Sequence, residues 1–337
     1  MSLFGVALRP MNSDEGATAR RTKRRRRLLG YAALSATLVL GAVLMLVAAG
    51  FHSLAVAAYP LPVQRPTTWE EILARPRPVT VEVLLTGTVY GDRLVVLDES
   101  DPNIEKIGDH HTPSTVSAYW VHHPTEGDYL IDAGLARAFA REGGNYTGLL
   151  RLMLALFGAE GRSTDGADVA AQLKSRGISP RAVFLTHLHG DHTSGLVDLP
   201  ALVPAVFGRG EATFMQKALI GDHLDGRPLY ALDFDEAHAL PPFERVLDLL
   251  GDGSIWAIST PGHSPNHVSY LVNAHSGPVL ITGDACAYNA QFENRIRPSP
   301  GVDDQEAAIR SLAGLRELYD QFPQLQVMVG HEPPRRR

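Results

Sequence analysis

Four potential metal ligands lie within six residues of this chain, directly after a short apolar run. The segment THLHGDH, residues 186–192, follows the apolar residues 182–185. Two histidines two positions apart in an extended chain point to the same side, and a turn at Gly190 brings the next Asp and His back toward them. Packing alone hardly explains such a density of donors, which supplies two half-sites of a zinc-like centre. We therefore expect a fold in which further donors reach this point.

Three further donors follow other apolar runs through a glycine. His263 comes after residues 255–258, Asp284 after residues 279–282 and His331 after residues 326–329. Each residue taken alone could be an ordinary turn residue. Together they predict that the remainder of a metal site is assembled at the ends of neighbouring strands.

These motifs resemble the signatures of the metallo-β-lactamase-fold hydrolase superfamily. THLHGDH, TPGHSPNH, ITGDA and VGHE match in order, IDAG at residues 131–134 matches its early Asp-x-Gly motif, and the resemblance spans residues 79–331. The resemblance implies an α/β fold, a four-layer αββα sandwich with two divalent metal ions. It implies that one ion is held by His187, His189 and His263, the other by Asp191, His192 and His331, with Asp284 bridging them. It also implies that Asp132 orients ligands, and we expect His267 to support or pack against them rather than bind metal.

The ligand set predicts hydrolysis. Imidazoles and carboxylates without a thiolate suit zinc, with manganese, iron or cobalt as alternatives. A water between two dications loses a proton near neutral pH, and the resulting hydroxide would attack a lactone or other ester carbonyl. Asp191 is the expected proton shuttle, because it could contact both the hydroxide and the leaving group.

Within the superfamily, the motifs are most similar to those of the N-acyl-homoserine-lactone lactonases. The similarity rests on residues 264–267, residues 283–294 and the long helix expected from Asp303. The bridging Asp284 disfavours a β-lactam substrate, His189 disfavours a flavodiiron protein, and the compact acidic body disfavours a ribonuclease. Tyr288 is the candidate for assisting the substrate oxygen, although it lies one position later than in that branch, and a packed loop aromatic is the alternative. A phosphodiester or thioester (glyoxalase-II-like) hydrolase and a non-catalytic metal-binding module remain open.

The N-terminal segment predicts a membrane anchor. Residues 1–27 hold eight Lys and Arg and two acids, out of 31 and 37 in the whole chain, so this tail carries +6 and the rest −12. Residues 28–51 contain no charged side chain, and as a helix they would extend about 36 Å, enough to cross a membrane. The basic tail predicts a cytoplasmic N-terminus and an extracytoplasmic catalytic domain. Secretion after signal cleavage near Ala57 is the alternative.

The rest of the chain is expected to form one domain. Residues 52–78 are rich in proline and predict an extended tether, with a short helix capped by Thr68 and Glu71. Residues 79–337 predict the hydrolase domain, with a strand at residues 93–97 and helices at residues 147–157, 166–176 and 303–322. The hydrolase motifs predict a small-molecule ester or lactone substrate, and because the body is acidic we expect no nucleic-acid partner. Its single cysteine, Cys286, excludes an internal disulfide.

Overall fold

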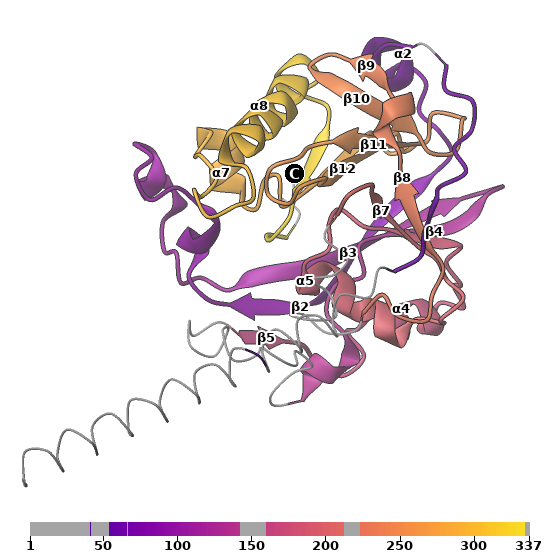
Figure 1. Ribbon diagram of the computed structural model, residues 1–337, viewed down its shortest axis with the longest axis horizontal. Helices are drawn as coiled ribbons and strands as arrows, with labels where there is room; N and C mark the ends of the chain where they lie inside the picture. Colours follow the sequence, from indigo (N-terminus) through magenta and orange to yellow (C-terminus); the bar gives the residue numbers. More distant parts are fainter. Residues whose placement is uncertain (1–40, 42–53, 66, 142–159, 212–222, 334–337) are drawn as a thin grey trace, which may run out of the picture. The chain divides into compact units, whose positions relative to one another are not determined.

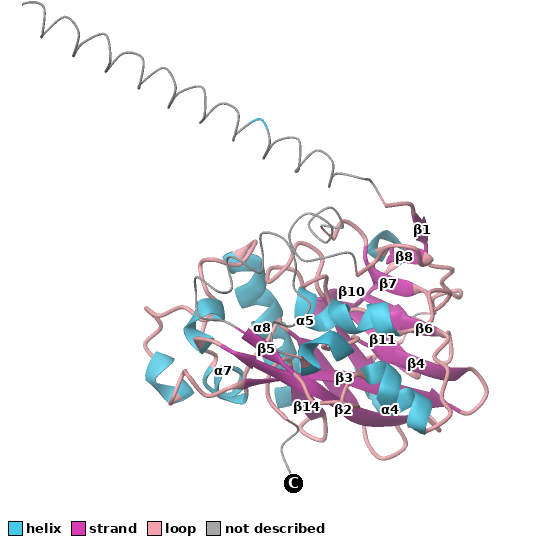
Figure 2. Ribbon diagram, turned by 90° about the horizontal axis from the view of Figure 1, so that it is seen from below, coloured by secondary structure: helices cyan, strands magenta, loops and turns pink. Residues whose placement is uncertain are grey.

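The computed structural model describes residue 41 and residues 54–65, 67–141, 160–211 and 223–333. Residues from Ser53 to Arg337 form one compact unit. Its two β-sheets pack face to face, and helices cover the outer face of each sheet (Figures 1 and 2). This arrangement is the predicted four-layer αββα sandwich.

The first sheet has eight strands in the order β1-β8-β7-β6-β4-β3-β2-β5. Strands β2, β3 and β4 are antiparallel neighbours, whereas β4, β6, β7, β8 and β1 run parallel to one another. The strand bounds are β1 Val56–Ala58, β2 Thr80–Tyr90, β3 Ser114–His123, β4 Gly127–Ile131, β5 Glu160–Arg162, β6 Ala182–Phe184, β7 Ala205–Gly208 and β8 Leu229–Leu232.

The second sheet has six strands in the order β14-β13-β12-β11-β10-β9. All its neighbours are antiparallel except β13 and β14. Strands β12 and β13 are buried along their whole length, as expected for apolar runs covered on both faces. The bounds are β9 His238–Leu240, β10 Phe243–Asp248, β11 Ile255–Ser259, β12 Val268–Val272, β13 Val279–Gly283 and β14 Gln326–Val329.

Helices close both outer faces. One cluster of buried side chains joins the six-stranded sheet to α2, α7 and α8, and another joins the eight-stranded sheet to α4 and η4. Cys286 is buried in the first of these clusters. The helix bounds are α2 Trp69–Leu73, α4 Val169–Ser175, α5 Gly190–Thr193, α7 Asn289–Asn294 and α8 Gln305–Gln321, and the short 3₁₀ helices are η1 Arg93–Val96, η2 Ile104–Ile107, η3 Arg137–Ala140, η4 Ser194–Asp198 and η6 Phe234–Glu236.

The predicted tether is wrong for the part of it that the structure describes. Strand β1 pairs in parallel with β8, and Tyr59 packs edge-on against Phe184 in the core between the sheets. Trp69 of α2 is buried against Trp256. The domain therefore begins well before Val79, because these apolar side chains fill gaps in the sandwich instead of standing in solvent.

Of the other local predictions, the strand is wrong, whereas the helices and the helix cap are confirmed. Residues 93–96 form the 3₁₀ helix η1 instead of the expected strand. Asp92 caps the start of this helix, because its side chain accepts the N–H of Leu94. The helices expected at residues 166–176 and 303–322 are α4 and α8, and Thr68 caps α2 by accepting the N–H of Glu71.

Two predicted helices cannot be compared with the structure. The expected membrane span, residues 28–51, and the expected helix at residues 147–157 lie outside the described residues, except for Gly41. Among the residues that are described, no helix is both long enough and apolar enough to cross a membrane.

Candidate metal centre

The expected donors all lie just beyond the ends of strands at one edge of the sandwich. Asp132 follows β4, and the THLHGDH segment leads from β6 into α5. In the other sheet, the segments that follow β11, β13 and β14 carry His263, Asp284 and His331. The centre therefore draws its donors from both sheets.

The structure brings the seven expected ligands together in two groups. Within each group the candidate ligand atoms lie within 4.8 Å of one another. The groups are His187, His189, His263 and Asp284, and Asp191, His192 and His331. The family resemblance implies the same two sets of side chains, with Asp284 shared between them instead of belonging to the first set.

Asp284 lies between the two groups, as a bridging ligand would. Its Oδ1 is 3.4 Å from Nε2 of His192, and its Oδ2 is 3.4 Å from Nε2 of His263 and 3.1 Å from Nε2 of His331. Although burial raises its pKa, the neighbouring His331 and His192 lower the pKa of Asp284 well below its usual value. Its carboxyl group is therefore ionised and faces both groups.

Three buried atoms of this set fit metal ions directly. Nε2 of His187, Nε2 of His192 and Oδ1 of Asp284 are buried and have no hydrogen-bond partner among the described residues. A buried polar atom without a partner costs about 1–3 kcal/mol. Coordination of a cation would satisfy all three atoms, and three such atoms of one predicted ligand set are hard to explain by packing.

Asp132 fixes the orientation of the candidate ligand His192. Its Oδ2 is 2.8 Å from Nδ1 of His192, and its Oδ1 accepts the N–H of Thr186 at 2.7 Å. When Nδ1–H donates to this carboxylate, Nε2 of the same ring is left free to bind metal. Asp132 adopts a left-handed backbone conformation, with φ 58°. In this conformation its carboxylate contacts Thr186, two residues beyond the end of β6.

Charge and burial set the protonation of the histidines in the metal-free protein. Burial lowers the pKa of His187 and of His263 well below the usual value, so both are neutral, the form that binds metal. For His192 burial acts in the same direction, but the carboxylates of Asp132, Asp284 and Asp191 raise its pKa well above the usual value. Against the same effect of burial, Asp284 raises the pKa of His331 to about 9. His192 and His331 therefore hold protons in the metal-free protein, and a metal ion would have to displace those protons to bind.

His267 supports the centre without joining either group. Its Nε2 accepts the N–H of Asp284 at 3.1 Å, and Nδ1 lies 2.9 Å from Oγ1 of Thr260. Burial lowers its pKa to about 3, which keeps Nε2 an acceptor. A Cβ at Gly283 would lie 2.7 Å from this Nε2, so the approach requires glycine at that position.

The two expected catalytic side chains occupy different environments. The Asp191 side chain is 19% exposed, so its carboxylate can meet both solvent and the ligand group. Tyr288 is buried, its hydroxyl is 3.0 Å from Oγ of Ser114, and its ring centroid lies 6.3 Å from that of His331. Burial raises the pKa of Tyr288 to about 12, so its hydroxyl stays protonated.

Sequence reasoning missed two features beside the centre, the buried Glu211 and the ion pair of Arg93 with Glu332. Glu211, buried beyond β7, accepts the hydroxyl of Ser264 at 2.6 Å and the N–H of Asn266 at 2.9 Å, and so fixes the loop that carries His263. Arg93 pairs with Glu332 at 2.9 Å, and its guanidinium carbon lies 4.6 Å above the Tyr288 ring. No sequence motif indicates Glu211, which lies 52 residues before His263. Glu332 could have been found from the sequence, because it directly follows His331.

Comparisons with known proteins identify relatives of this chain. The family model described as the metallo-beta-lactamase superfamily matches residues 111–319. The chain is 31% identical over 229 residues to the N-acyl homoserine lactonase AttM of Azorhizobium caulinodans, covering 65% of this chain and 82% of that protein. It is 28% identical over 228 residues to AttM of Agrobacterium fabrum, with the same shares covered.

Solved structures show the same fold. An N-acyl homoserine lactone hydrolase with N-hexanoyl-L-homoserine at its catalytic metal centre superposes with a TM-score of 0.59 at 20% identity, covering 76% of this chain and 94% of that one. The dizinc quorum-quenching lactonase AidC superposes with a TM-score of 0.52 at 17% identity, covering 77% and 89%.

Proposed function

Because the chain belongs to the metallo-beta-lactamase superfamily and is a metal-dependent, lactonase-like hydrolase, we propose that it binds two metal ions and hydrolyses a lactone or another ester. The observation that carries the proposal is the pair of donor groups with three unpartnered buried ligand atoms. N-acyl homoserine lactones are the first substrates to test, since the relatives above are named for them.

We assign His187, His189 and His263 to one ion, Asp191, His192 and His331 to the other, and Asp284 to both. Zinc is the expected metal, because the donor set is imidazole and carboxylate, with manganese, iron or cobalt as alternatives. When bound, a pair of such ions lowers the pKa of a water molecule and polarises the substrate carbonyl.

The chain's own side chains supply the remaining functions. We propose that the partly exposed Asp191 carboxylate takes a proton from the attacking water and passes it to the leaving alkoxide. Tyr288 has a hydroxyl that stays protonated and can turn from Ser114 to donate to a substrate oxygen. Asp132, His267 and Glu211 keep the donors in place and touch no substrate.

The test joins metal content to hydrolysis of a substrate panel. Purified full-length protein is loaded with zinc, and an N-acyl homoserine lactone, an aryl ester, a thioester and a bis-aryl phosphate are assayed. We expect about two ions per chain, fastest turnover of the lactone or ester, and loss of turnover in His187→Ala and Asp191→Ala. His122→Ala is the matched control, because this exposed histidine pairs with Asp128 and belongs to neither group.

Two results would contradict the proposal. Fewer than two ions per chain together with no turnover would favour a non-catalytic metal-binding module. Fastest turnover of the phosphate or the thioester would assign a different reaction to the same centre.

We also propose that residues 28–51 anchor the protein in a membrane, with the N-terminus cytoplasmic and the catalytic domain on the other side. Support comes from the 24 uncharged residues and the basic tail before them. Cleavage near Ala57 would cut through β1, whose three residues pair with β8. Alkaline extraction of membranes and protease protection test the proposal; a soluble, shortened chain would contradict it.

A further inference from the structure

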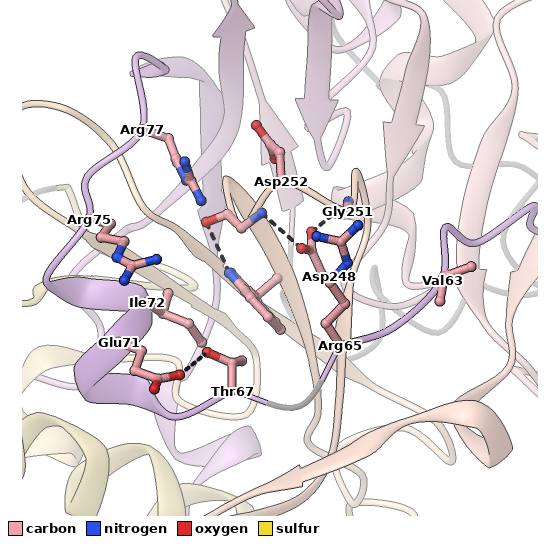
Figure 3. A pocket seen from close by; sticks show the side chains of 12 residues that line it. Val63, Arg65, Thr67, Glu71, Ile72, Arg75, Arg77, Asp248, Gly251 and Asp252 are labelled. Carbon is pink, nitrogen blue, oxygen red and sulfur yellow. Dashed lines mark hydrogen bonds between the residues drawn. The ribbon is translucent and has the colours of Figure 1, made fainter.

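A pocket lies away from the metal centre, beside the turn that joins two strands of the six-stranded sheet. It is lined by residues of the N-terminal segment, from Val63 to Arg77, and by the turn from Asp248 to Trp256 that joins β10 to β11 (Figure 3). Strand β11 separates this turn from the loop that carries His263. Its five residues extend about 17 Å at about 3.3 Å per residue, so an occupant of this pocket would not touch the metal ligands.

Three arginines, Arg65, Arg75 and Arg77, line this pocket. None of them makes an ion pair with another residue that the structure describes, and Figure 3 marks no hydrogen bond to their guanidinium groups. Nε of Arg77 is buried and has no hydrogen-bond partner within the described part of the chain. A buried donor without a partner is unfavourable, so the pocket presents an unused guanidinium donor at Arg77.

The acidic residues of the pocket keep their negative charge, but within the described part of the chain none of them makes an ion pair with these arginines, and their oxygens accept hydrogen bonds from other groups. Asp248 accepts the backbone N–H groups of Gly251 and Gly253 at 2.9 and 2.8 Å. Asp252 accepts Nε2 of His123 at 3.0 Å, and Glu71 accepts the hydroxyl of Thr67 at 3.1 Å. The guanidinium groups therefore remain available to an anion from outside.

The backbone that carries the arginines is held in place. The side-chain amide of Asn273 donates to the carbonyls of Ile72 and Arg75 at 2.7 and 3.0 Å, and the N–H of Arg77 donates to the carbonyl of Asn273 at 2.8 Å. A Cβ at Gly253 would lie 3.5 Å from Nη2 of Arg77, which places this guanidinium over the turn. The donors are thus partly ordered before a ligand arrives, which reduces the entropic cost of binding.

We propose that this arginine pocket (Arg65, Arg75 and Arg77 beside the Asp248–Trp256 turn) is a binding site for an oxyanion, a phosphate or carboxylate group. Planar guanidinium groups bind either group with two parallel hydrogen bonds. Ile72 and Trp256 add an apolar wall that would accept a carbon skeleton attached to the anion. The site goes beyond the proposed hydrolysis and does not depend on it.

The test uses the three tryptophans of the chain as local probes. Full-length zinc-loaded protein in detergent is labelled with ¹⁵N-tryptophan and titrated with inorganic phosphate or with acetate at constant ionic strength. Trp256 lines the pocket, whereas the indole N–H of Trp120 is bonded to Asp128 in the other sheet. We expect saturable movement of the Trp256 indole signal, with a dissociation constant on the order of 1 mM, and a constant Trp120 signal.

Substitutions then assign the site. Arg77→Gln and Arg75→Gln are each expected to weaken the anion about tenfold, as loss of a charge-assisted hydrogen bond predicts. Arg310→Gln is the control, because this arginine is 69% exposed on α8 and outside the pocket. If Arg77→Gln fails to fold, the exposed Arg75 carries the test.

The phosphate and acetate titrations, the arginine variants and the chelator control together distinguish the possible outcomes. Saturation by phosphate, by acetate or by both supports the site and identifies the group it prefers. A Trp256 signal that neither anion moves would overturn the proposal. So would equal affinities in the arginine variants and the control, or an effect that disappears when zinc is removed by a chelator, since the anion would then be binding at the metal centre.

Discussion

Replacing Asp132 by Asn tests most directly how the metal centre is held. The buried carboxylate accepts the N–H of Thr186 at 2.7 Å and faces Nδ1 of His192 at 2.8 Å. Asn keeps the size of the side chain and tolerates the left-handed backbone at this position. Its amide oxygen can still accept from Thr186, but its NH₂ group cannot accept from His192. The substitution therefore removes one charge-assisted hydrogen bond and leaves the backbone intact.

The magnitude follows from that one bond. A hydrogen bond to a charged group contributes about 1.5–3 kcal/mol, and loss of such an outer partner typically costs 10–100-fold in metal affinity or activity. These values agree, because tenfold corresponds to about 1.4 kcal/mol. We expect zinc affinity to fall 10–100-fold in Asp132→Asn. We also expect the pKa of metal-free His192 to fall, since Asp132 is the strongest influence that raises it.

The assay is competition for zinc against a chromophoric chelator, with turnover measured at saturating zinc. Asp128→Asn is the matched control, because Asp128 lies at the other end of β4 and accepts from the indole of Trp120 and from His122 at 2.8 and 2.9 Å. Zinc affinity should be unchanged in the control. If Asp132→Asn binds zinc as tightly as the unmodified chain, Asp132 does not orient His192 and the reasoning fails.

Three further predictions follow from the same contacts. Tyr288→Phe should lower kcat about tenfold or more with little change in zinc affinity, whereas Tyr230→Phe on β8 should change neither; equal kcat values would leave Tyr288 a packing residue. Glu211→Gln should weaken zinc about tenfold by loosening the His263 loop, measured by the same competition, and unchanged affinity would exclude that role. Burial lowers the pKa of His223 from its usual value of 6.5 to about 4. The unfolded chain therefore binds a proton at this residue more readily than the folded one, so the free energy of unfolding is not reduced by His223 above about pH 6.5 and falls by up to about 3 kcal/mol as the pH falls toward 4. His223→Gln should reduce the dependence of the urea unfolding midpoint on pH between pH 6.5 and 4. If the midpoint changes with pH as steeply in this variant as in the unmodified chain, the prediction is wrong.

The local half of the metal centre could be predicted from spacing. His187, His189, Asp191 and His192 are held together by one strand end and the turn into α5, so chain geometry alone brings them close. Asp132 could be predicted only from the family resemblance, and the structure gives the reason for its place, because β4 and β6 are parallel neighbours and their carboxyl ends meet. Chain geometry over a few residues therefore determines the first set of contacts, whereas the order of strands in the sheet determines those of Asp132.

Contacts between distant segments could not be predicted in this way. Tyr59 enters the core and β1 joins β8 because the sandwich leaves room there, and no periodicity of residues 54–78 indicates this. Proline-rich sequence is equally compatible with a tether and with a segment that packs along an edge. The arginine pocket has the same origin, since its arginines meet the Asp248–Trp256 turn only after that segment has packed.

The division of donors between the sheets links metal binding to folding. The THLHGDH segment belongs to the eight-stranded sheet, whereas His263, Asp284 and His331 belong to the six-stranded sheet. Each ion would therefore be held by both sheets, so its binding free energy would also stabilise their packing. Without cations, the unpartnered atoms of His187, His192 and Asp284 face one another across that junction. Metal binding at this centre would therefore favour the association of the two sheets more than the folding of either sheet alone.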